Sequence, residues 1–306
     1  LFFMTLDENN LFKRLYFSVF HSVSAFCNAG FSTYSDSLMR YRGNISVNII
    51  TMILIIAGGI GFLVTYEIKS KLKGLFFNRR KKTRLRNYYI FSLHTWLVLV
   101  TTVILIISGT VLIFTIESLS GNSVSLLESL FQSVTSRTAG FNTVEISNLS
   151  KATLLVIAAL MFIGGSPGSA AGGIKTSTFA VIISMMFMGR NHFEDVVIRN
   201  RQLPKRTVYQ ALMVFIFASV IIFFTVVLVS AFDPEKETIA VLFESVSAFG
   251  TVGLSTGITP YLTEISKIII TITMFCGRIG SLTIFSIILS KEKNPGRLAE
   301  ERVLIG

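Results

Sequence analysis

Residues 20–30 read Phe20-His-Ser-Val-Ser-Ala-Phe-Cys-Asn-Ala-Gly30, and two later segments follow the same pattern. They are Phe131-Gln-Ser-Val-Thr-Ser-Arg-Thr-Ala-Gly140, which is one residue shorter, and Phe243-Glu-Ser-Val-Ser-Ala-Phe-Gly-Thr-Val-Gly253. Each segment is too short to span a membrane, leads into a glycine turn and is flanked by long apolar runs. Several such loops around one axis make an ion filter. The repeat therefore predicts pore loops.

The composition predicts an integral membrane protein. Apolar residues make up 51% of the 306 residues, phenylalanine alone contributes 27, and the mean hydropathy is +0.67. Runs long enough to cross about 30 Å of hydrocarbon lie at Ile45–Thr65, Tyr89–Ile116, Val208–Phe232 and Ile265–Leu289. Backbone groups in lipid need internal partners, so these runs are expected to be helices. The predicted fold class is all-α integral membrane.

The net charge of +11 is grouped between the apolar runs instead of being spread over a soluble face, which argues against nucleic-acid binding. Basic residues crowd residues 69–86, 190–206 and 291–302. By the positive-inside rule, the two loops and the C-terminal tail are expected to be cytoplasmic in a multi-pass protein of the cell membrane. We interpret them as topology signals in contact with anionic membrane lipids, with docking of a partner as the alternative.

The sequence shows no set of residues typical of an enzyme active site. Cys27 and Cys276 fall in membrane-depth segments without metal-ligand spacing, and the three histidines are scattered. The sequence contains no Ser-His-Asp set, no paired carboxylates on one helix face and no HExxH motif. We therefore expect neither an enzyme nor a bound cofactor.

The spacing of the repeat predicts a unit made of a span, a pore loop and a second span. The repeat glycines lie 110 and 113 residues apart, and each interval holds the same order of elements. A short helix is expected from about Leu126 to Ser136, capped by Asn122 or Ser123, and another from a Thr238 cap to about Ala248. The C-terminal carbonyls of such helices favour a cation.

The residues before the repeat glycines are predicted to form the filter through their backbone carbonyls, because they carry no carboxylate. Glycine permits the positive-φ geometry that aligns successive carbonyls. Uncharged hard oxygens suit a weakly hydrated monovalent ion better than Ca²⁺ or Mg²⁺. The alternative is that these glycines only form turns that let helices pack closely. The presence of three copies of the motif in the same register argues against it. The expected filter residues are Cys27, Asn28, Ala29, Gly30, Thr138, Ala139, Gly140, Thr251, Val252 and Gly253.

A glycine-rich segment at residues 164–173 interrupts two apolar stretches and cannot remain a regular helix. Irregular backbone at membrane depth survives only where it lines protein or a water-filled cavity, so a mobile plug in the conduction path is predicted. A kinked helix remains an alternative; a phosphate loop is disfavoured because Ile174 interrupts its motif and no strand precedes it. The expected gate residues are Gly164, Gly165, Ser166, Pro167, Gly168, Ser169, Ala170, Gly172, Gly173, Lys175 and Arg278.

Arg278 is included among the expected gate residues because it lies near the middle of the apolar run Ile265–Leu289. A lone arginine at that depth costs roughly 2.5–3.5 kcal/mol on insertion scales, so it should face water, a partner or the pore. Its alternative role is a salt bridge or carbonyl brace between helices. Arg137 is expected to brace the carbonyls at the end of its pore helix, and Lys175 could take either role.

SVSAFCNAGFS, SVTSRTAGFNT, SVSAFGTVGLSTGITP and GRIGSLT make essentially the whole chain resemble the membrane subunit of the Ktr/Trk/HKT superfamily of potassium transporters, in its KtrB-type form. The resemblance implies pseudo-fourfold repeats around a central pore, with a glycine-rich intramembrane loop below the filter. This chain would supply part of unit two (1–74), unit three (75–190) and unit four with the tail (191–306), with unit one and the first span of unit two missing.

The resemblance further implies potassium uptake, with K⁺ as the transported ion on the filter carbonyls and the arginine at the position of Arg278 beneath the filter. It implies a homodimer on a cytosolic ring of nucleotide-binding regulatory subunits of the KtrA/TrkA kind. Three alternatives stay open. They are a coupled secondary transporter with a broken-helix substrate site, a Na⁺-permeable cation transporter of the same fold, and a non-transporting assembly partner.

Overall fold

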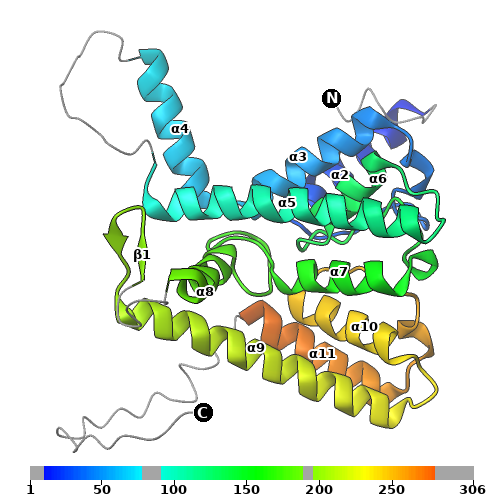
Figure 1. The fold of residues 1–306 in the computed structure, drawn as a ribbon. Helices are drawn as coiled ribbons and strands as arrows, with labels where there is room; N and C mark the ends of the chain where they lie inside the picture. Colours follow the sequence, from blue (N-terminus) through cyan, green and yellow to red (C-terminus); the bar gives the residue numbers. More distant parts are fainter. Residues whose placement is uncertain (1–9, 78–90, 189–195, 280–306) are drawn as a thin grey trace, which may run out of the picture.

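The computed structural model describes residues 10–77, 91–188 and 196–279, and these form a mainly helical protein (Figure 1). The expected all-α fold class is confirmed. The basic residues at 79–86, 190 and 291–302, and the last apolar run beyond residue 279 with most of GRIGSLT, lie outside the described residues. The described helices are α2 (Leu11–Phe26), α3 (Ile45–Gly59), α4 (Phe62–Phe77), α5 (Leu93–Leu119), α6 (Leu126–Thr135), α7 (Lys151–Phe162), α8 (Thr176–Met188), α9 (Lys205–Phe232), α10 (Thr238–Gly250) and α11 (Glu264–Ile279).

Short elements complete the described chain. Three single-turn 3₁₀ helices, η1 (Met39–Tyr41), η2 (Ile146–Asn148) and η3 (Thr259–Tyr261), lie in the segments that follow the repeat glycines. One two-stranded antiparallel hairpin, β1 (Val197–Ile198) and β2 (Arg201–Gln202), precedes α9.

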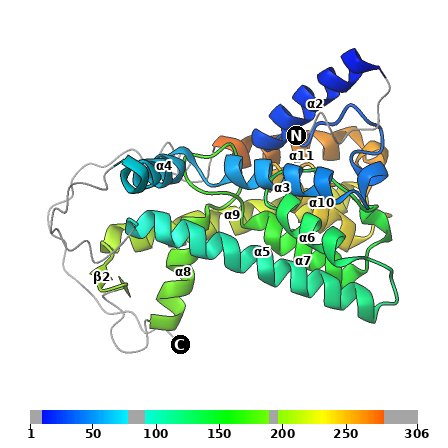
Figure 2. The ribbon, with the colours of Figure 1, turned by 90° about the horizontal axis from the view of Figure 1, so that it is seen from above.

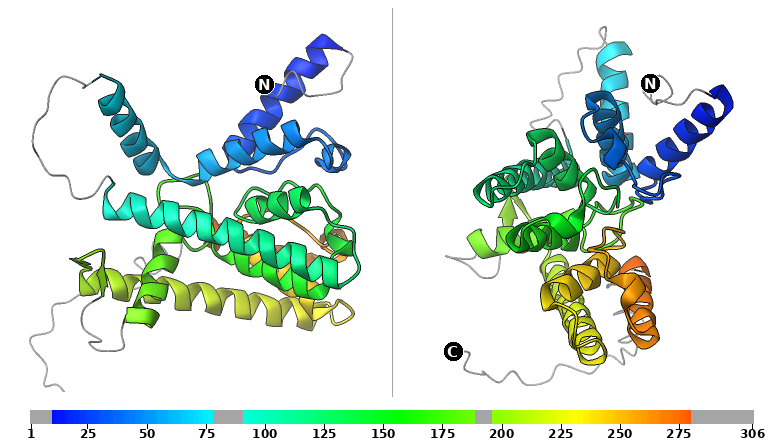
Figure 3. Two further views of the ribbon diagram at one scale, coloured as in Figure 1. Left: turned by 45° about the horizontal axis from the view of Figure 1, so that its top comes forward. Right: turned by 90° about the vertical axis from the view of Figure 1, so that its right-hand side faces the viewer.

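The helices gather in three sets around loops near the middle of the molecule (Figure 3). In the first set α2 packs on α3, in the second α6 lies against α5 and α7, and in the third α10 lies against α9 and α11. The sets also meet one another, because α3 contacts α6 and α10 contacts α7. The short helices α6 and α10 are thus each held between two longer helices, whereas α2, with 16 residues, packs on α3.

The two predicted pore helices begin slightly away from their expected caps. Ser125, not Asn122 or Ser123, caps α6, and it forms a capping box with Glu128 that satisfies backbone donors on both sides. Helix α10 begins at Thr238 itself, with Glu237 in the capping position. In both cases the difference is one to three residues and leaves the helix ends at the repeats in place.

Two described helices, α5 and α9, are long and apolar enough to cross a membrane, and they run lengthwise through the molecule (Figure 2). The expected span Ile45–Thr65 is broken: α3 and α4 meet at an angle of 104°, so together they form either a broken span or a re-entrant pair. The break lies at Gly61, whose φ of +91° is unfavourable for any residue with a side chain. Backbone groups freed there bind elsewhere, since the Phe62 amide donates to the Gly168 carbonyl at 3.1 Å.

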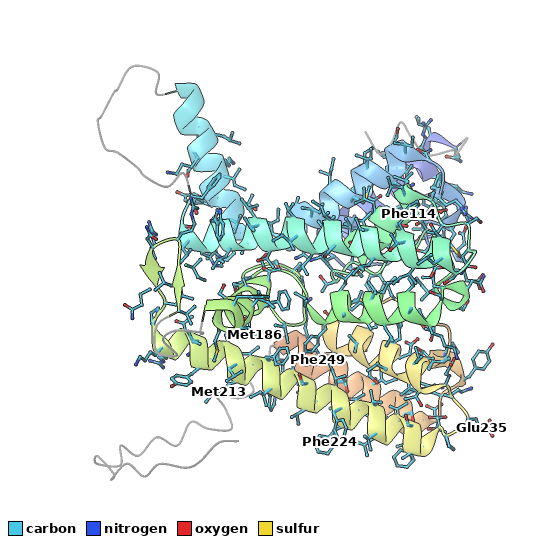
Figure 4. All side chains as sticks on the ribbon, in the orientation of Figure 1. Phe114, Met186, Met213, Phe224, Glu235 and Phe249 are labelled. Carbon is cyan, nitrogen blue, oxygen red and sulfur yellow. The ribbon has the colours of Figure 1, made fainter. Side chains whose placement is uncertain are left out.

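The core lies between α5, α7, α9 and α10, while the outer faces of the long helices are apolar and exposed. Ile157, Phe243 and Phe249 are buried there at 1% exposure or less, whereas Phe224 on α9 is 57% exposed (Figure 4). Long exposed apolar faces on the described helices suit contact with lipid instead of water.

Candidate ion filter and its neighbouring loop

The three repeats adopt one backbone conformation as they leave their pore helices. The repeat glycine and the residue two positions before it both have positive φ, and the residue between them does not. Left-handed conformations are costly for the non-glycine members, so their recurrence at corresponding positions marks a shared local geometry. The angles are 50° at Asn28 and 71° at Gly30, 76° at Thr138 and 82° at Gly140, and 49° at Thr251 and 91° at Gly253.

The repeat glycines lie side by side in chain order. A Cβ atom on Gly30 would stand 2.5 Å from the Ala139 carbonyl oxygen and 3.0 Å from the Gly140 Cα. A Cβ on Gly140 would collide with the Val252 carbonyl oxygen and stand 3.4 Å from the Gly253 Cα. Three segments far apart in sequence are therefore packed backbone against backbone, with room for hydrogen only at the first two glycines.

A repeated hydroxyl bond fixes the carbonyl that follows each glycine. The Ser24 hydroxyl donates to the Phe31 carbonyl at 2.8 Å, and the Thr135 hydroxyl donates to the Phe141 carbonyl at 2.6 Å. In the last repeat the Ser247 hydroxyl donates to the Leu254 carbonyl at 2.7 Å. The sequence contained the signal, since these are the final Ser or Thr of Phe-x-Ser-Val-Ser/Thr, but no role was predicted for them.

The glycine-rich segment forms a closed loop between α7 and α8. Ile174 donates to the Phe162 carbonyl at 3.1 Å and pairs as a β-bridge with Ile163, while the Ser166 and Thr176 hydroxyls lie 3.0 Å apart. The loop follows a helix, which is not the setting of a phosphate-binding loop. An uninterrupted kinked helix is excluded as well, because residues 163–175 are not helical.

The loop packs directly against two of the predicted filter segments, those ending at Gly140 and Gly253, and against the α3–α4 bend. A Cβ on Gly164 would stand 3.2 Å from Thr138, and one on Gly172 would stand 2.8 Å from the Gly250 carbonyl and collide with the Thr251 hydroxyl. On its other side, the backbone amide of Ser166 in the loop donates to the Gly59 carbonyl at 2.9 Å. Glycine is therefore needed on the loop where it meets the filter.

Three cationic side chains donate to carbonyl groups of the loop. Arg278 of α11 donates to Ala170 at 2.5 Å, Lys175 donates to Ala171 at 2.6 Å, and the buried Arg137 donates to Gly164 at 3.3 Å. The predicted gate residues are thus brought together. The bond from Arg278 has the geometry of a carbonyl brace, and the positive charge of its guanidinium lies beside the loop.

The three predicted filter segments are not equally covered. A groove of about 760 Å³ is bordered by residues 27–29 on one side and residues 251–255 on the other, with Phe275 and Arg278 of α11 along its wall. The segment ending at Gly140 instead has a neighbouring filter segment on both sides. Among the described residues there is no cluster of three His, Cys, Asp or Glu side chains that could hold a metal ion.

Comparison with known proteins finds relatives along nearly the whole chain. Residues 4–296 match the family model TrkH, described as cation transport protein. The chain is 38% identical over 288 residues to Ktr system potassium uptake protein B of Bacillus subtilis, covering 92% of this chain and 61% of that protein. It is 34% identical to Potassium/sodium uptake protein NtpJ of Enterococcus hirae, covering 96% and 65%.

A solved structure shares the fold. The potassium transporter TrkH from Vibrio parahaemolyticus superposes with a TM-score of 0.68 at 19% sequence identity, covering 92% of this chain and 59% of that one. The chain spans about three fifths of the length of these curated relatives, 61% in the case of the Bacillus protein.

Proposed function

The chain belongs to the TrkH family of cation transport proteins, and from this premise we propose that it takes up potassium across the cell membrane through a carbonyl-lined filter. The family is one of transporters and not of enzymes. The observation that carries the proposal is the contact between Gly30, Gly140 and Gly253, each with positive φ. Backbone oxygens gathered in this way, without a carboxylate in the filter segments, suit K⁺ as the transported ion.

We propose that the loop 164–173 is the gate. Its contacts with Thr138 and with Gly250 and Thr251 support this role, because they place the loop directly against two of the predicted filter segments. Arg278 and Lys175 hold the loop through hydrogen bonds to its carbonyl oxygens. These hydrogen bonds can break and form again as the loop moves. Movement of the loop would then open the path while the filter keeps its shape.

The division into units, with boundaries at residues 74 and 190, belongs to the same proposal. The three helix sets supply three filter segments, and the groove between residues 27–29 and residues 251–255 is where a fourth segment would complete the ring. Such a segment would reach both neighbouring filter backbones. Its source would be the part of the relatives' length that this chain does not match.

Partners and placement follow from the family resemblance. We propose a homodimer in the cell membrane whose cytoplasmic basic loops and tail contact a cytosolic ring of nucleotide-binding regulatory subunits. The excess of Lys and Arg in these segments supports their cytoplasmic orientation and contact with anionic lipid. No cofactor is proposed for this chain.

A second candidate is transport of Na⁺ together with K⁺. The name of the Enterococcus relative, a potassium/sodium uptake protein, favours it specifically. A coupled secondary transporter with a broken-helix substrate site has less support, because three like pore loops are not the inverted pairs typical of such folds.

Ion uptake by the full-length protein tests the proposal. A bacterium lacking its own potassium uptake should grow at low K⁺ when it expresses the protein, and purified protein in vesicles should carry K⁺ in preference to Na⁺. Equal rates for both ions would favour the Na⁺-permeable alternative. No flux of either ion, with the protein correctly inserted, would refute transport.

A further inference from the structure

The residue after the first phenylalanine of each repeat differs in type but is always polar and buried. It is His21 in α2, Gln132 in α6 and Glu244 in α10, with exposures of 1%, 0% and 6%. Buried polar side chains require partners, so each must have a reason for its position. None of the three was predicted as a site residue.

Glu244 binds the segment that follows the last filter glycine. Its Oε1 accepts from the Ser255 hydroxyl at 2.8 Å, the Thr256 amide at 2.8 Å and the Thr256 hydroxyl at 3.0 Å. Its Oε2 accepts from the Thr259 hydroxyl at 2.9 Å. Four donors on one buried carboxylate make a strong local anchor, since bonds to charged groups exceed neutral ones in strength.

His21 contacts the corresponding residues of its own repeat. Its Nε2 lies 3.1 Å from the Ser32 hydroxyl, eleven residues on, and accepts from the Thr33 amide at 3.4 Å, twelve residues on. Glu244 bonds at the same separations of eleven and twelve residues. The register is therefore a property of the repeat and not an accident of one side chain.

Gln132 departs from this pattern. Neither polar atom of its amide has a hydrogen-bond partner within the part of the chain that the structure describes, and the same holds for the Thr143 hydroxyl. Its segment is held by the neighbouring set instead: Asn142 accepts through its carbonyl from Leu38 at 3.1 Å and donates through its amide to Ser37 at 3.2 Å. A segment with neighbours on both sides does not depend on its own pore helix for this anchor.

We propose that Glu244 is the positioning residue of the filter segment that ends at Gly253. Ser247 holds the Leu254 carbonyl on one side, and Glu244 holds residues 255–259, directly after it. This segment borders the open groove, so it depends on its own pore helix more than the segment ending at Gly140 does. Both carboxylate oxygens are occupied by donors from the chain, so Glu244 acts through geometry and not as an ion ligand. The inference rests on the proposed potassium filter.

Three variants of the full-length protein test it. Glu244→Ala removes all four bonds and should lower the K⁺/Na⁺ uptake ratio about tenfold, the scale expected for losing bonds to a charged group. Glu244→Gln copies the residue of the α6 repeat, keeps an accepting oxygen and should stay within about twofold of the parent, because the Thr259 hydroxyl can turn to accept. Glu237→Gln is the matched control, a carboxylate at the N-cap of the same helix that is 55% exposed and paired with Lys151.

Hydrogen exchange gives a readout that does not need transport. In Glu244→Ala the amides of residues 254–259 should exchange faster, while Glu237→Gln should match the parent. A parent-like uptake ratio or parent-like exchange in Glu244→Ala would overturn the proposal. So would a Glu244→Gln variant as unselective as Glu244→Ala, which would make the charge itself decisive.

The failure of this inference and the failure of the proposed function give different results. A parent protein without K⁺ preference refutes the filter, whereas a selective parent with an insensitive Glu244→Ala refutes only the positioning role. If Glu244→Ala does not fold, the double variant Ser255→Ala with Thr259→Val removes two of the same bonds from the loop side. It should shift selectivity and exchange in the same direction, and parent-like values there would equally overturn the role.

Discussion

At the scale of single residues, the filter glycines are not equivalent. A side chain on Gly140 would meet the Val252 carbonyl, whereas a Cβ on Gly253 would find its nearest neighbour at 3.8 Å, although both residues have positive φ. Substitution at Gly253 therefore adds backbone strain alone, and substitution at Gly140 adds strain and a collision with the next segment.

We expect Gly140→Ala to reduce the K⁺/Na⁺ flux ratio of the full-length protein more than Gly253→Ala does. Strain at a left-handed residue costs about 1–2 kcal/mol, so Gly253→Ala should lose roughly tenfold and Gly140→Ala more. Gly43→Ala is the control, since nothing lies within 4 Å of a Cβ placed there. Unchanged selectivity in both filter variants would remove these glycines from the filter.

Arg278 supplies the second prediction. Its bond to Ala170 holds the loop, and its charge repels a passing cation by roughly 2 kcal/mol at about 8 Å with an effective dielectric of about 20. Arg278→Ala should therefore raise K⁺ flux by up to about thirty-fold without changing selectivity. Arg278→Lys keeps the charge but not the planar fork, so a rise in this variant as well would assign the effect to the brace.

Lys267→Ala is the matched control for Arg278, because Lys267 pairs with Glu264 on the outside of the same helix. Flux and thermal stability are measured together for all three variants. A less stable Arg278→Ala variant with no gain in flux would show that Arg278 supports the fold and does not restrain the loop.

At the scale of elements, apolar length predicted the long helices α5 and α9 well, whereas the caps expected for the two pore helices were one to three residues away from the observed ones. The described α5 and α9 begin and end within a few residues of the runs read from sequence, because a run of twenty or more apolar residues is a local feature. The break between α3 and α4 was missed, since its apolar run is continuous and the deciding bonds come from residues 166–168. Likewise, no local pattern predicts a bond between Arg278 and Ala170, which are 108 residues apart.

The loop 164–173 yields the third prediction. Shortening it should raise basal K⁺ flux and leave the K⁺/Na⁺ ratio nearly unchanged, since an obstruction is removed and the filter keeps its own hydroxyl bonds. Gly61→Ala should act in the same direction, because its Cβ would collide with the Pro167 carbonyl and displace the loop from the α3–α4 bend. Slower transport by a shortened protein that is folded and inserted would mark the segment as a structural linker.

At the scale of the whole molecule, the groove leads to the fourth prediction. Among the described residues, the segments ending at Gly30 and Gly253 each have a neighbouring filter segment on one side only, so vesicles containing residues 1–306 by themselves should carry no K⁺ above background. The full-length protein in matched vesicles should carry it. Selective K⁺ flux through the isolated chain would mean that three segments suffice, or that two copies complete one another.

The contact between Gly30, Gly140 and Gly253 also bears on how the chain folds. Each of the two contacts joins positions more than a hundred residues apart, so the first cannot form before the chain has reached Gly140 and the second cannot form before it has reached Gly253, after all the described α-helices but α11. Contacts of such long range are late events, because the entropy of closing the intervening chain is lost before the contact stabilises anything. During biogenesis the filter is therefore the last part to assemble. A defect in any helix set, however distant, should appear first as a protein that reaches the membrane but does not discriminate between ions.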